Sequence, residues 1–534
     1  MRVRGRDLWP AALTGDLVTE THYGRAMPCY PARPRTLGEV LDRAADRVAG
    51  RDAVVAPDRR LTWGELRAEV DRTAAALHAR HGVKPGDRVA LLFLNSVEFC
   101  VGVFACARLG AVAVTLNTKL RAPELAFMLQ NSGARLLLMH DSVWGEIAPI
   151  RAAIPCEAIY VAGRAPAGTE PLEALRERAS PPAVAVSEED VAFIMYTSGT
   201  TGRPKGAMGT HLGIITSNVS FQRCMGLRDG DRTLVAAPLF HVTGLIGQFL
   251  SMAFVGGTTV VMRTFDAAEA VRLLDAERIT YMIAAPTVFT MMRQQPGYRA
   301  AGQTLRAVGY GGAPTPPDGI VAMREWLPGA TLQNAYGMTE TCSPTTLSPA
   351  GEELRRISSV GWPVPIAEVR TIDVATGREC EAGEVGELWV SGPMVVPGYW
   401  ANPEATAASM GDGWMRTGDL ARIDADGYVT VMDRLKDMIN RGGEKVYCVE
   451  VEDVLCAHPA VLEAAVVGVP DPTYGEAVKA CVVARAGAAV DVEDVRRWVA
   501  ARLAKFKVPR EIVVLDSLPR NPNGKVIKHE LRAL

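Results

Sequence analysis

Hydrophobic and polar positions follow two different periods along this chain, and the two periods alternate. Thr36-Leu-Gly-Glu39 and Thr62-Trp-Gly-Glu65 are capping-box patterns, and each stands before an amphipathic run with helical spacing. They predict helices over 40–48 and 66–79, and a third helical pattern covers 98–109. Short apolar segments predict strands at 89–94, 111–116, 135–139, 191–195, 233–237, 258–262 and 281–284. Strands that alternate with helices in this way are typical of a parallel α/β sheet.

The pattern changes in the last third of the chain. Residues 357–432 are rich in Gly and Pro and hold short β-like pieces such as Gly386-Glu-Leu-Trp-Val-Ser391, which indicates a β-rich subdomain. A final α/β segment follows, with strands predicted at 464–469 and 478–483 and a helix over 490–505. Because 534 residues exceed what one hydrophobic core usually supports, we expect at least two domains.

Composition narrows the classes of function. Lys and Arg (58) almost balance Asp and Glu (60), so we expect a small-molecule substrate and no nucleic-acid partner. No signal-like apolar segment follows Met1, and no run of about 18 uncharged apolar residues occurs later, which predicts a cytoplasmic protein without stable membrane insertion. The ten cysteines form no C-x-x-C pair and stand near no His cluster. We therefore expect small buried side chains, with neither a disulfide framework nor a cysteine metal site.

One glycine-rich segment suits a phosphate. Tyr196-Thr-Ser-Gly-Thr-Thr-Gly-Arg-Pro-Lys-Gly206 comes directly after the predicted strand at 191–195, and its backbone N–H groups and hydroxyls can wrap polyphosphate while Lys205 adds charge. It is not a Walker A loop, because Gly206 stands where that motif requires Ser or Thr. A generic segment of this composition would be a solvated loop, but eleven residues in this order favour the phosphate-binding interpretation.

This segment resembles the phosphate-binding signature of the adenylate-forming superfamily, which includes acyl-CoA synthetases, peptide-synthetase adenylation domains and luciferases. Together the resembling segments extend over residues 35–530. The resemblance implies an acyl-CoA synthetase that uses ATP and Mg²⁺ to activate a carboxylic acid as its acyl-AMP, and then passes the acyl group to coenzyme A. The further segments, in order, are Pro238-Leu-Phe-His241, Gly311-Gly-Ala-Pro314, Asn334-Ala-Tyr-Gly-Met-Thr-Glu340, Thr417-Gly-Asp-Leu420, Asp433-Arg-Leu-Lys-Asp437 and Asn523-Gly-Lys525.

The resemblance also assigns roles in nucleotide binding. It implies that Tyr336 stacks on adenine, that Thr339 hydrogen-bonds the α-phosphate, and that Glu340 holds Mg²⁺ together with Thr201. Oxygen ligands suit that ion. Standing alone, Glu340 would be a surface carboxylate and Tyr336 a core ring. The other residues implied to bind nucleotide are Thr197, Ser198, Gly199, Thr200, Gly202, Lys205, Gly312, Ala313, Pro314, Asn334 and Gly337.

Three charged residues complete the implied adenylation site. Asp419 resembles the carboxylate that accepts both ribose hydroxyls, and Arg434 resembles a second ribose and phosphate contact; either could otherwise belong to a surface salt bridge. Lys525 matches the lysine that family members bring to the acid oxygen and the α-phosphate. Because a carboxylate attacking a phosphate brings two anions together, a cation at this place suits the chemistry.

Thioester formation requires a second arrangement, and the resemblance implies that the C-terminal domain swings to provide it. Lys436 aligns with the hinge, and Gly442 and Gly443 align with glycines that line the coenzyme A channel, where a larger side chain would block a close backbone approach. The implied fold is α/β, with a large N-terminal domain of stacked α/β sheets plus a β-rich subdomain (1–435) and a small mobile α+β C-terminal domain (436–534). Where related synthetases continue Gly-Gly-Glu-Asn-Ile-Tyr-Pro, this chain has Cys448 in place of Pro, which we expect to soften the segment.

The acyl pocket is predicted to be apolar. No charged residue lies between 236 and 257, and Glu340 is the only one in 309–314 and 335–344. This favours a medium-chain fatty or aromatic acid over a dicarboxylate or an amino acid, although Arg223 could intrude from outside these segments. His241 resembles the gate of the acyl site and is counted with Lys525, Thr339 and Glu340 as catalytic, but a packed core histidine is an equal alternative. Small residues at Thr243, Gly244 and Gly247 suit either a deep tunnel or close helix packing.

Two other functions stay open. A relative could form the same adenylate and pass the acyl group to a carrier protein, although the chain holds no fused carrier domain. A catalytically inactive acyl-nucleotide binding protein should have lost Lys525, Glu340 or Asp419, and all three are present. The expected partner is a small carboxylic acid, and a homodimer is left open.

Overall fold

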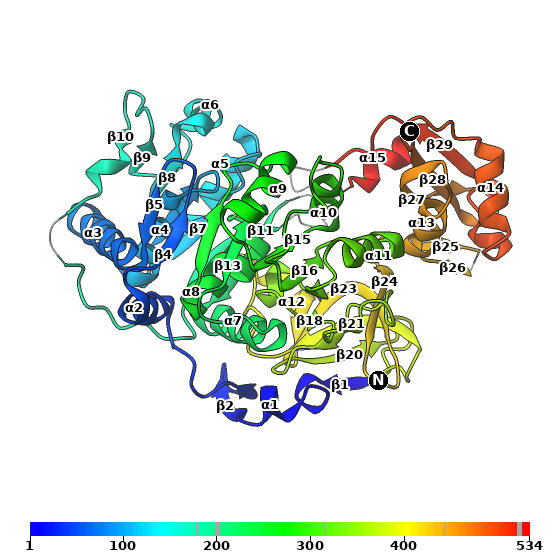
Figure 1. The fold of residues 1–534 in the computed structure, drawn as a ribbon, viewed down its shortest axis with the longest axis horizontal. Coiled ribbons are helices and arrows are strands. Elements are labelled where there is room, and N and C mark those ends of the chain that lie inside the picture. Colours follow the sequence, from blue (N-terminus) through cyan, green and yellow to red (C-terminus); the bar gives the residue numbers. More distant parts are fainter. Residues whose placement is uncertain (178–179, 198–202, 314, 443, 521–525) are drawn as a thin grey trace.

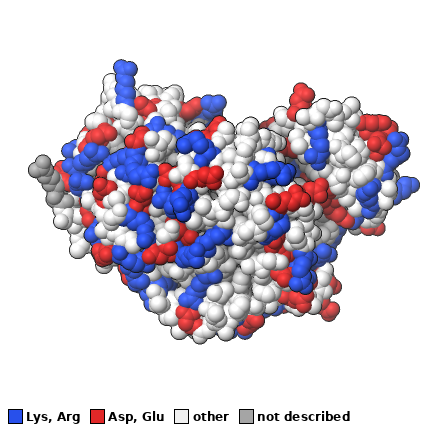
Figure 2. All heavy atoms as spheres, in the orientation of Figure 1, with Lys and Arg blue, Asp and Glu red and all other residues white. Residues whose placement is uncertain are grey.

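The computed structural model describes residues 1–177, 180–197, 203–313, 315–442, 444–520 and 526–534. A large N-terminal domain is followed by a smaller C-terminal domain, drawn in orange and red in Figure 1. Within these ranges no helix is both long and apolar enough to cross a membrane. Lys and Arg alternate with Asp and Glu over the visible face of both domains (Figure 2), so the balance of charge in the sequence is also a local balance on this face.

The predicted parallel strands form two sheets in the N-terminal domain. The first has the order β10-β9-β8-β6-β7-β11-β12 and is parallel except for its last strand. Its strands are β6 (Arg88–Leu92), β7 (Val112–Thr115), β8 (Leu136–His140), β9 (Ala158–Ala162), β10 (Glu170–Pro171), β11 (Val191–Thr197) and β12 (Lys205–Thr210). Because βαβ crossovers cover both faces of such a sheet, its strands are apolar on both sides.

The second sheet has nine strands in the order β19-β18-β17-β16-β15-β13-β14-β4-β5. The six from β17 to β4 are parallel, and β5, β18 and β19 are each joined to the neighbouring strand by antiparallel pairing. Its strands are β4 (Asp52–Val55), β5 (Arg60–Thr62), β13 (Arg232–Val235), β14 (Thr258–Val261), β15 (Tyr281–Ala284), β16 (Ala307–Gly311), β17 (Thr331–Tyr336), β18 (Thr346–Leu347) and β19 (Trp362–Pro363).

Helices between the two sheets join them into one core. A buried apolar cluster takes side chains from both sheets and from helices α2 (Leu37–Val48), α3 (Trp63–His81), α4 (Val97–Arg108) and α7 (His211–Met225). The prediction of stacked α/β sheets is confirmed. Outer helices, including α5 (Ala122–Ser132), α9 (Ala267–Ala276), α10 (Pro286–Arg293) and α11 (Pro317–Trp326), cover the other faces (Figure 1).

The two predicted capping boxes differ in the structure. Thr62 and Glu65 form the complete box, since each side chain accepts a hydrogen bond from the backbone of the other. At α2 only half of it forms: Thr36 caps the N–H of Glu39, but the Glu39 carboxylate accepts from Arg35 N instead, one residue earlier than predicted. Both helices nevertheless begin where the pattern placed them.

The β-rich subdomain is a six-stranded antiparallel sheet, as predicted. Its members are β1 (Arg2–Arg4), β20 (Glu368–Ile372), β21 (Val385–Ser391), β22 (Met410–Gly411), β23 (Trp414–Ile423) and β24 (Val429–Arg434). The edge strand β1 is the start of the chain, and Arg2 pairs with Arg370 of β20. The sequence pattern did not predict that the first residues belong to this sheet.

A five-stranded sheet organises the C-terminal domain, and its helices pack against it. Its elements are β25 (Ile439–Arg441), β26 (Glu444–Val446), α13 (Cys448–Cys456), β27 (Val461–Asp471), β28 (Gly475–Ala484), α14 (Val492–Ala500), β29 (Glu511–Leu515) and α15 (Lys528–Ala533). The helix predicted to continue to 505 ends at Ala500, and a 3₁₀ turn follows at Lys505–Lys507. Pro509 disfavours α-helical backbone at Val508, so the chain leaves the helical conformation before this residue.

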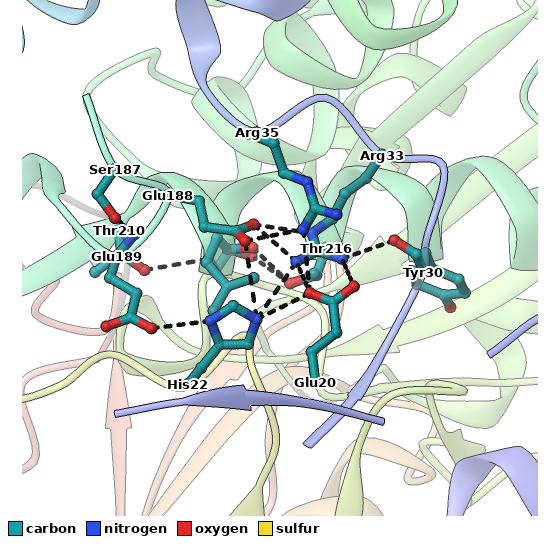
Figure 3. Close-up of polar contacts among 12 residues, drawn as sticks. Glu20, His22, Tyr30, Arg33, Arg35, Ser187, Glu188, Glu189, Thr210 and Thr216 are labelled. Carbon is teal, nitrogen blue, oxygen red and sulfur yellow. Dashed lines mark hydrogen bonds and ion pairs between the residues drawn. The ribbon is translucent and has the colours of Figure 1, made fainter. Parts of the chain in front are cut away.

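The N-terminal hairpin, β2 (Val18–His22) and β3 (Arg25–Cys29), is tied to the loop that leads into β11. Figure 3 shows the ion pairs that connect them. The Arg33 side chain is fully buried and donates to Glu20 and Glu188, and Arg35 contacts the same two carboxylates. The guanidinium of Arg33 holds the pKa of Glu20 down at about 2, so Glu20 is ionised at neutral pH.

Cys29 lies beside His22 in the structure, although the positions of the cysteines along the sequence did not indicate such a pair. Glu20, His22 and Cys29 present ligand atoms within 4.8 Å of one another. Arg33 Nη2, however, lies 2.6 Å from Glu20 Oε2 and 3.4 Å from His22 Nε2, so a guanidinium supplies the positive charge that a metal ion would bring. The ten cysteines are free thiols and all but Cys456 are buried, as predicted.

Candidate functional site

The motifs gather where strands of the two sheets end. Gly311 closes β16 and Tyr336 closes β17, its parallel neighbour, so the segments after them share one edge of the nine-stranded sheet. Thr197 ends β11 of the other sheet and pairs with Lys205, the first residue of β12. The carboxyl ends of parallel strands are the usual place for a nucleotide site in open α/β sheets.

The phosphate-loop motif begins in β11 and ends in β12. Thr197 and Lys205 are placed by the antiparallel pairing of these two strands. The Lys205 ammonium lies 5.3 Å from the centre of the Tyr399 ring, in a cation–π contact. The predicted phosphate contacts Ser198, Gly199, Thr200, Thr201 and Gly202 lie outside the described residues, as does the predicted metal role of Thr201.

Glu340 has the surroundings of a cation ligand. Its residue is 7% exposed, and its Oε1 accepts hydrogen bonds from Thr197 Oγ1 (3.3 Å) and from Tyr399 OH (2.9 Å). In the part of the chain that the structure describes, no Lys or Arg lies within 4 Å of this carboxylate to balance its charge. Burying an unpaired carboxylate is costly, so its oxygens fit a Mg²⁺ ion, which prefers such hard ligands.

Tyr336 and Asp419 form a second part of the site. The Tyr336 hydroxyl donates to Asp419 Oδ2 at 2.6 Å, which joins the end of β17 to β23. Burial, and then the adjacent carboxylate, raise the pKa of Tyr336 well above its usual value, so the phenol remains a donor. Arg434 of β24 pairs with Asp419 across the sheet, with Nε 3.9 Å from Oδ1. These three predicted nucleotide contacts are therefore neighbours.

The remaining predicted nucleotide contacts lie close to these groups. Asn334 is held within β17 by a hydrogen bond from its N–H to Ser348, and Thr339 is buried beside Glu340. Gly337 lies close to the following segment, since an added Cβ would make a tight contact of 3.2 Å with the backbone of Pro344. Gly312 has φ +79°, and Ala313 follows it, exposed. Pro314 is outside the described residues.

His241 is half-buried at the head of the segment predicted to form the acyl pocket. The turn before it is held by Asn95, which follows β6: Asn95 Oδ1 accepts from Leu239 N at 2.7 Å and Asn95 Nδ2 donates to Ala237 O at 3.1 Å. From β7, Thr115 Oγ1 donates to Phe240 O at 3.4 Å. Residues of the first sheet thus position the loop that carries His241.

The helix after His241 is a π-helix over Thr243–Leu250. An added Cβ at Gly244 would lie 2.4 Å from Pro238 O, and the carbonyl of Gly247 accepts a hydrogen bond from the buried Tyr281 hydroxyl. Gly244 therefore serves close packing, the second of the two predicted roles, whereas an added Cβ at Gly247 would lie at an ordinary contact distance of 3.5 Å. Single turns of π-helix often occur at functional sites.

Arg223 does not enter the acyl segments. Its guanidinium forms an ion pair with Asp16 and lies 4.4 Å from the ring centre of Tyr30, near the N-terminus of the chain. An arginine engaged in this way does not supply a free positive charge to a dicarboxylate substrate. Most residues between 236 and 257 are buried, so few of them lie at the surface of the protein.

The predicted hinge and channel residues follow β24 along the chain. Lys436 is exposed in the turn after β24, and Gly442, with φ +62°, packs against Tyr474 of the C-terminal domain. Gly443 and Lys525 lie outside the described residues. The Cys448 N–H donates to Asp433 Oδ2 at 2.5 Å, a hydrogen bond that proline cannot donate, so the cysteine ties this segment to β24, which opposes the softening expected from the loss of proline.

Sequence motifs did not reveal Tyr399 or Asn95. Tyr399 lies 59 residues from the Glu340 side chain that it contacts, and Asn95 lies 144 residues from Leu239. Neither belongs to a motif that the sequence singled out. The one signal in the sequence was that Asn95, a polar residue, directly follows the apolar run at 89–94.

Comparison with known proteins agrees with this arrangement. Residues 41–400 match the family model described as AMP-binding enzyme, and residues 450–525 match the model of the AMP-binding enzyme C-terminal domain. The chain is 41% identical to a feruloyl-CoA synthase of Amycolatopsis over 473 residues, covering 88% of this chain and 93% of that protein. It is 38% identical to the fatty acid–[acyl-carrier-protein] ligase ScoC of Streptomyces coeruleorubidus, covering 90% and 92% of the two chains.

A solved structure shows the same fold with nucleotide bound. The O-succinylbenzoate coenzyme A synthetase of Bacillus subtilis, in complex with ATP and a magnesium ion, superposes with a TM-score of 0.82 at 33% identity. The match covers 92% of this chain and 99% of that one.

Proposed function

The chain belongs to the family of AMP-binding enzymes, and from this premise we propose that it is an AMP-forming acyl- or aryl-CoA ligase for an apolar carboxylic acid. Two observations carry the proposal: Tyr336, at the end of β17, hydrogen-bonds to Asp419, and the buried Glu340, four residues further along the chain, hydrogen-bonds to Thr197 at the end of β11. A buried carboxylate that has no basic partner among the described residues, together with a phenol–carboxylate pair that begins four residues before it in the chain, suits a magnesium nucleotide.

In the first half-reaction these side chains bind and orient the nucleotide. Asp419 accepts the ribose hydroxyls, Tyr336 stacks on adenine, and Thr339 donates to the α-phosphate. Glu340, with Thr201, is the ligand for Mg²⁺, which when bound offsets the negative charge of the phosphates. Lys525 is the cation that lies between the acid oxygen and the α-phosphate while that bond forms and pyrophosphate leaves.

In the second half-reaction the acyl group passes to coenzyme A. We place the boundary between the domains at 435/436, with Lys436 as the hinge and with Gly442 and Gly443 beside the pantetheine channel. Rotation of residues 436–534 removes Lys525 and opens that channel. The hydrogen bond from Cys448 N–H to Asp433 crosses this boundary and must lengthen or re-form when the domain turns.

The acid is apolar because the segment after His241 holds no charge and Arg223 is engaged elsewhere. An aromatic acid is the first choice, since a feruloyl-CoA synthase is 41% identical to this chain; a medium-chain fatty acid is the second. The similarity to ScoC, a fatty acid–[acyl-carrier-protein] ligase, favours one alternative, in which the same adenylate is passed to a carrier protein.

One assay separates these outcomes. AMP formation that depends on ATP, Mg²⁺ and coenzyme A is measured over a panel of hydroxycinnamic, benzoic, fatty and dicarboxylic acids, with mass detection of the acyl-CoA. Turnover of one apolar group supports the proposal and names the acid. Adenylate without thioester favours a carrier protein, and the absence of any adenylate contradicts the proposed activity.

A further inference from the structure

The backbone of Tyr399 is held beside the strand that begins with Lys205. Met208 N donates to Gly398 O at 3.1 Å and Trp400 N donates to Gly206 O at 2.7 Å, so the residues on both sides of Tyr399 are paired with β12. A β-bridge joins Ala207 to Tyr399 itself. This pairing determines where the Tyr399 side chain can point.

The hydroxyl of Tyr399 reaches the buried carboxylate of Glu340. Tyr399 is 7% exposed, and its OH donates to Glu340 Oε1 at 2.9 Å, where Thr197 Oγ1 also donates at 3.3 Å. Two donors on one oxygen fix the plane of the carboxylate. In the described ranges of the chain no side-chain donor lies on Oε2, which leaves this second oxygen to a cation.

The ring of Tyr399 carries the second contact. The Lys205 ammonium, 5.3 Å from the ring centre, lies at the start of the strand that also pairs with the Tyr399 backbone. One side chain thus touches both the lysine of the phosphate loop and the acidic residue expected to hold the metal. A variant that lacks only the hydroxyl would lose the contact with Glu340 and keep the ring contact with Lys205.

We propose that Tyr399 is a positioning residue, whose hydroxyl orients Glu340 so that Oε2 faces the Mg²⁺ of the bound nucleotide. The inference rests on the proposed function and extends it to a residue outside the sequence motifs. Groups that hydrogen-bond a metal ligand commonly raise metal affinity by fixing the orientation of that ligand.

The test is a thermodynamic cycle on nucleotide binding. The affinity for a non-cleavable ATP analogue is measured with Mg²⁺ and with EDTA, for the wild type and for Tyr399→Phe, which keeps the ring over Lys205 and removes only the hydroxyl. Because loss of such an outer contact costs about tenfold or more in metal affinity, the gain in nucleotide affinity from Mg²⁺ should fall about tenfold. The affinity in EDTA should stay within about twofold of wild type, because the ring contact is retained.

Tyr160→Phe is the matched control. Tyr160 is also buried, and its hydroxyl hydrogen-bonds to His81 Nε2 at 2.8 Å, in the first sheet away from Glu340. This variant should keep the wild-type gain from Mg²⁺. An unchanged gain in Tyr399→Phe overturns the inference, and so does an equal loss of affinity with Mg²⁺ and with EDTA. Because the acid panel tests activity separately, a normal panel with an unchanged gain overturns only the role of Tyr399.

Discussion

Asn95 offers a direct test of how the first sheet positions the acyl site. Its side-chain amide holds the backbone of Ala237 and Leu239 in place, directly before His241, through the bonds of 3.1 Å and 2.7 Å. Asn95→Ala removes both bonds while leaving the Glu340 and Asp419 groups intact. The loop that carries His241 should then lose its fixed position, and the acid should bind less productively than in the wild type.

The expected magnitude follows from burial. Leu239 is 1% exposed, so its N–H loses its acceptor without gaining water, which costs about 1–3 kcal/mol. If about 2 kcal/mol of this cost appears in the transition state, kcat/KM for the acid falls roughly 30-fold. Thr115→Val removes a longer bond of 3.4 Å to the same loop, and it should lower kcat/KM less than Asn95→Ala does.

The assay is AMP release, with acid and ATP varied in turn, beside thermal unfolding of each variant. The expected result is a large rise in KM for the acid with KM for ATP near the wild-type value. An acid kcat/KM within about threefold of wild type would refute the positioning of His241 by Asn95, because such a change leaves transition-state binding intact. Equal losses for acid and ATP, together with a lower Tm, would assign Asn95 to stability alone.

Three further outcomes are expected. Lys525→Ala should nearly abolish adenylation but leave transfer from preformed acyl-AMP to coenzyme A largely intact, and equal loss of both half-reactions would contradict its assignment. Gly443→Leu should reduce CoA-ester yield more than pyrophosphate release, whereas normal thioester formation would remove Gly443 from the channel. The pKa of Glu20 is lowered to about 2 by Arg33, so its ion pair stabilises the protein at pH values above the ordinary glutamate pKa. The free energy of unfolding should therefore fall between about pH 5 and pH 2, and less steeply in Glu20→Gln; parallel curves in urea titrations would refute this contribution.

Much of the fold could be predicted because its signals are local. Apolar runs of four to six residues marked the parallel strands, and the Thr62–Glu65 pattern marked the start of α3. Tyr336 and Asp419 were expected in one nucleotide site, and they form a hydrogen bond of 2.6 Å. These features depend on neighbours in sequence or on a motif of fixed spacing.

The features that could not be predicted depend on distant partners or on small differences in backbone geometry. The hydroxyl of Tyr399 finds Glu340 only when β12 and the segment after β21 lie side by side. The π-helix at Thr243–Leu250 shares the apolar composition of an α-helix, so no hydrophobic period distinguishes the two. At the start of α2, the Glu39 carboxylate accepts a hydrogen bond from the backbone N–H of Arg35 and not from the adjacent N–H of Thr36, which the capping-box pattern predicts.

Because β1 pairs with β20, the first strand cannot enter its sheet until β20 has been synthesised. Arg2 and Glu368, which form an ion pair across these strands, are 366 residues apart in the chain. At roughly 5–20 residues per second, the first strand leaves the ribosome about 20–70 s before its partner exists. For that time it is an unpaired edge strand, available to other chains. The alternating arginines Arg2 and Arg4 carry charge along this edge, and charged side chains are a common means of keeping such an edge from pairing with the wrong partner.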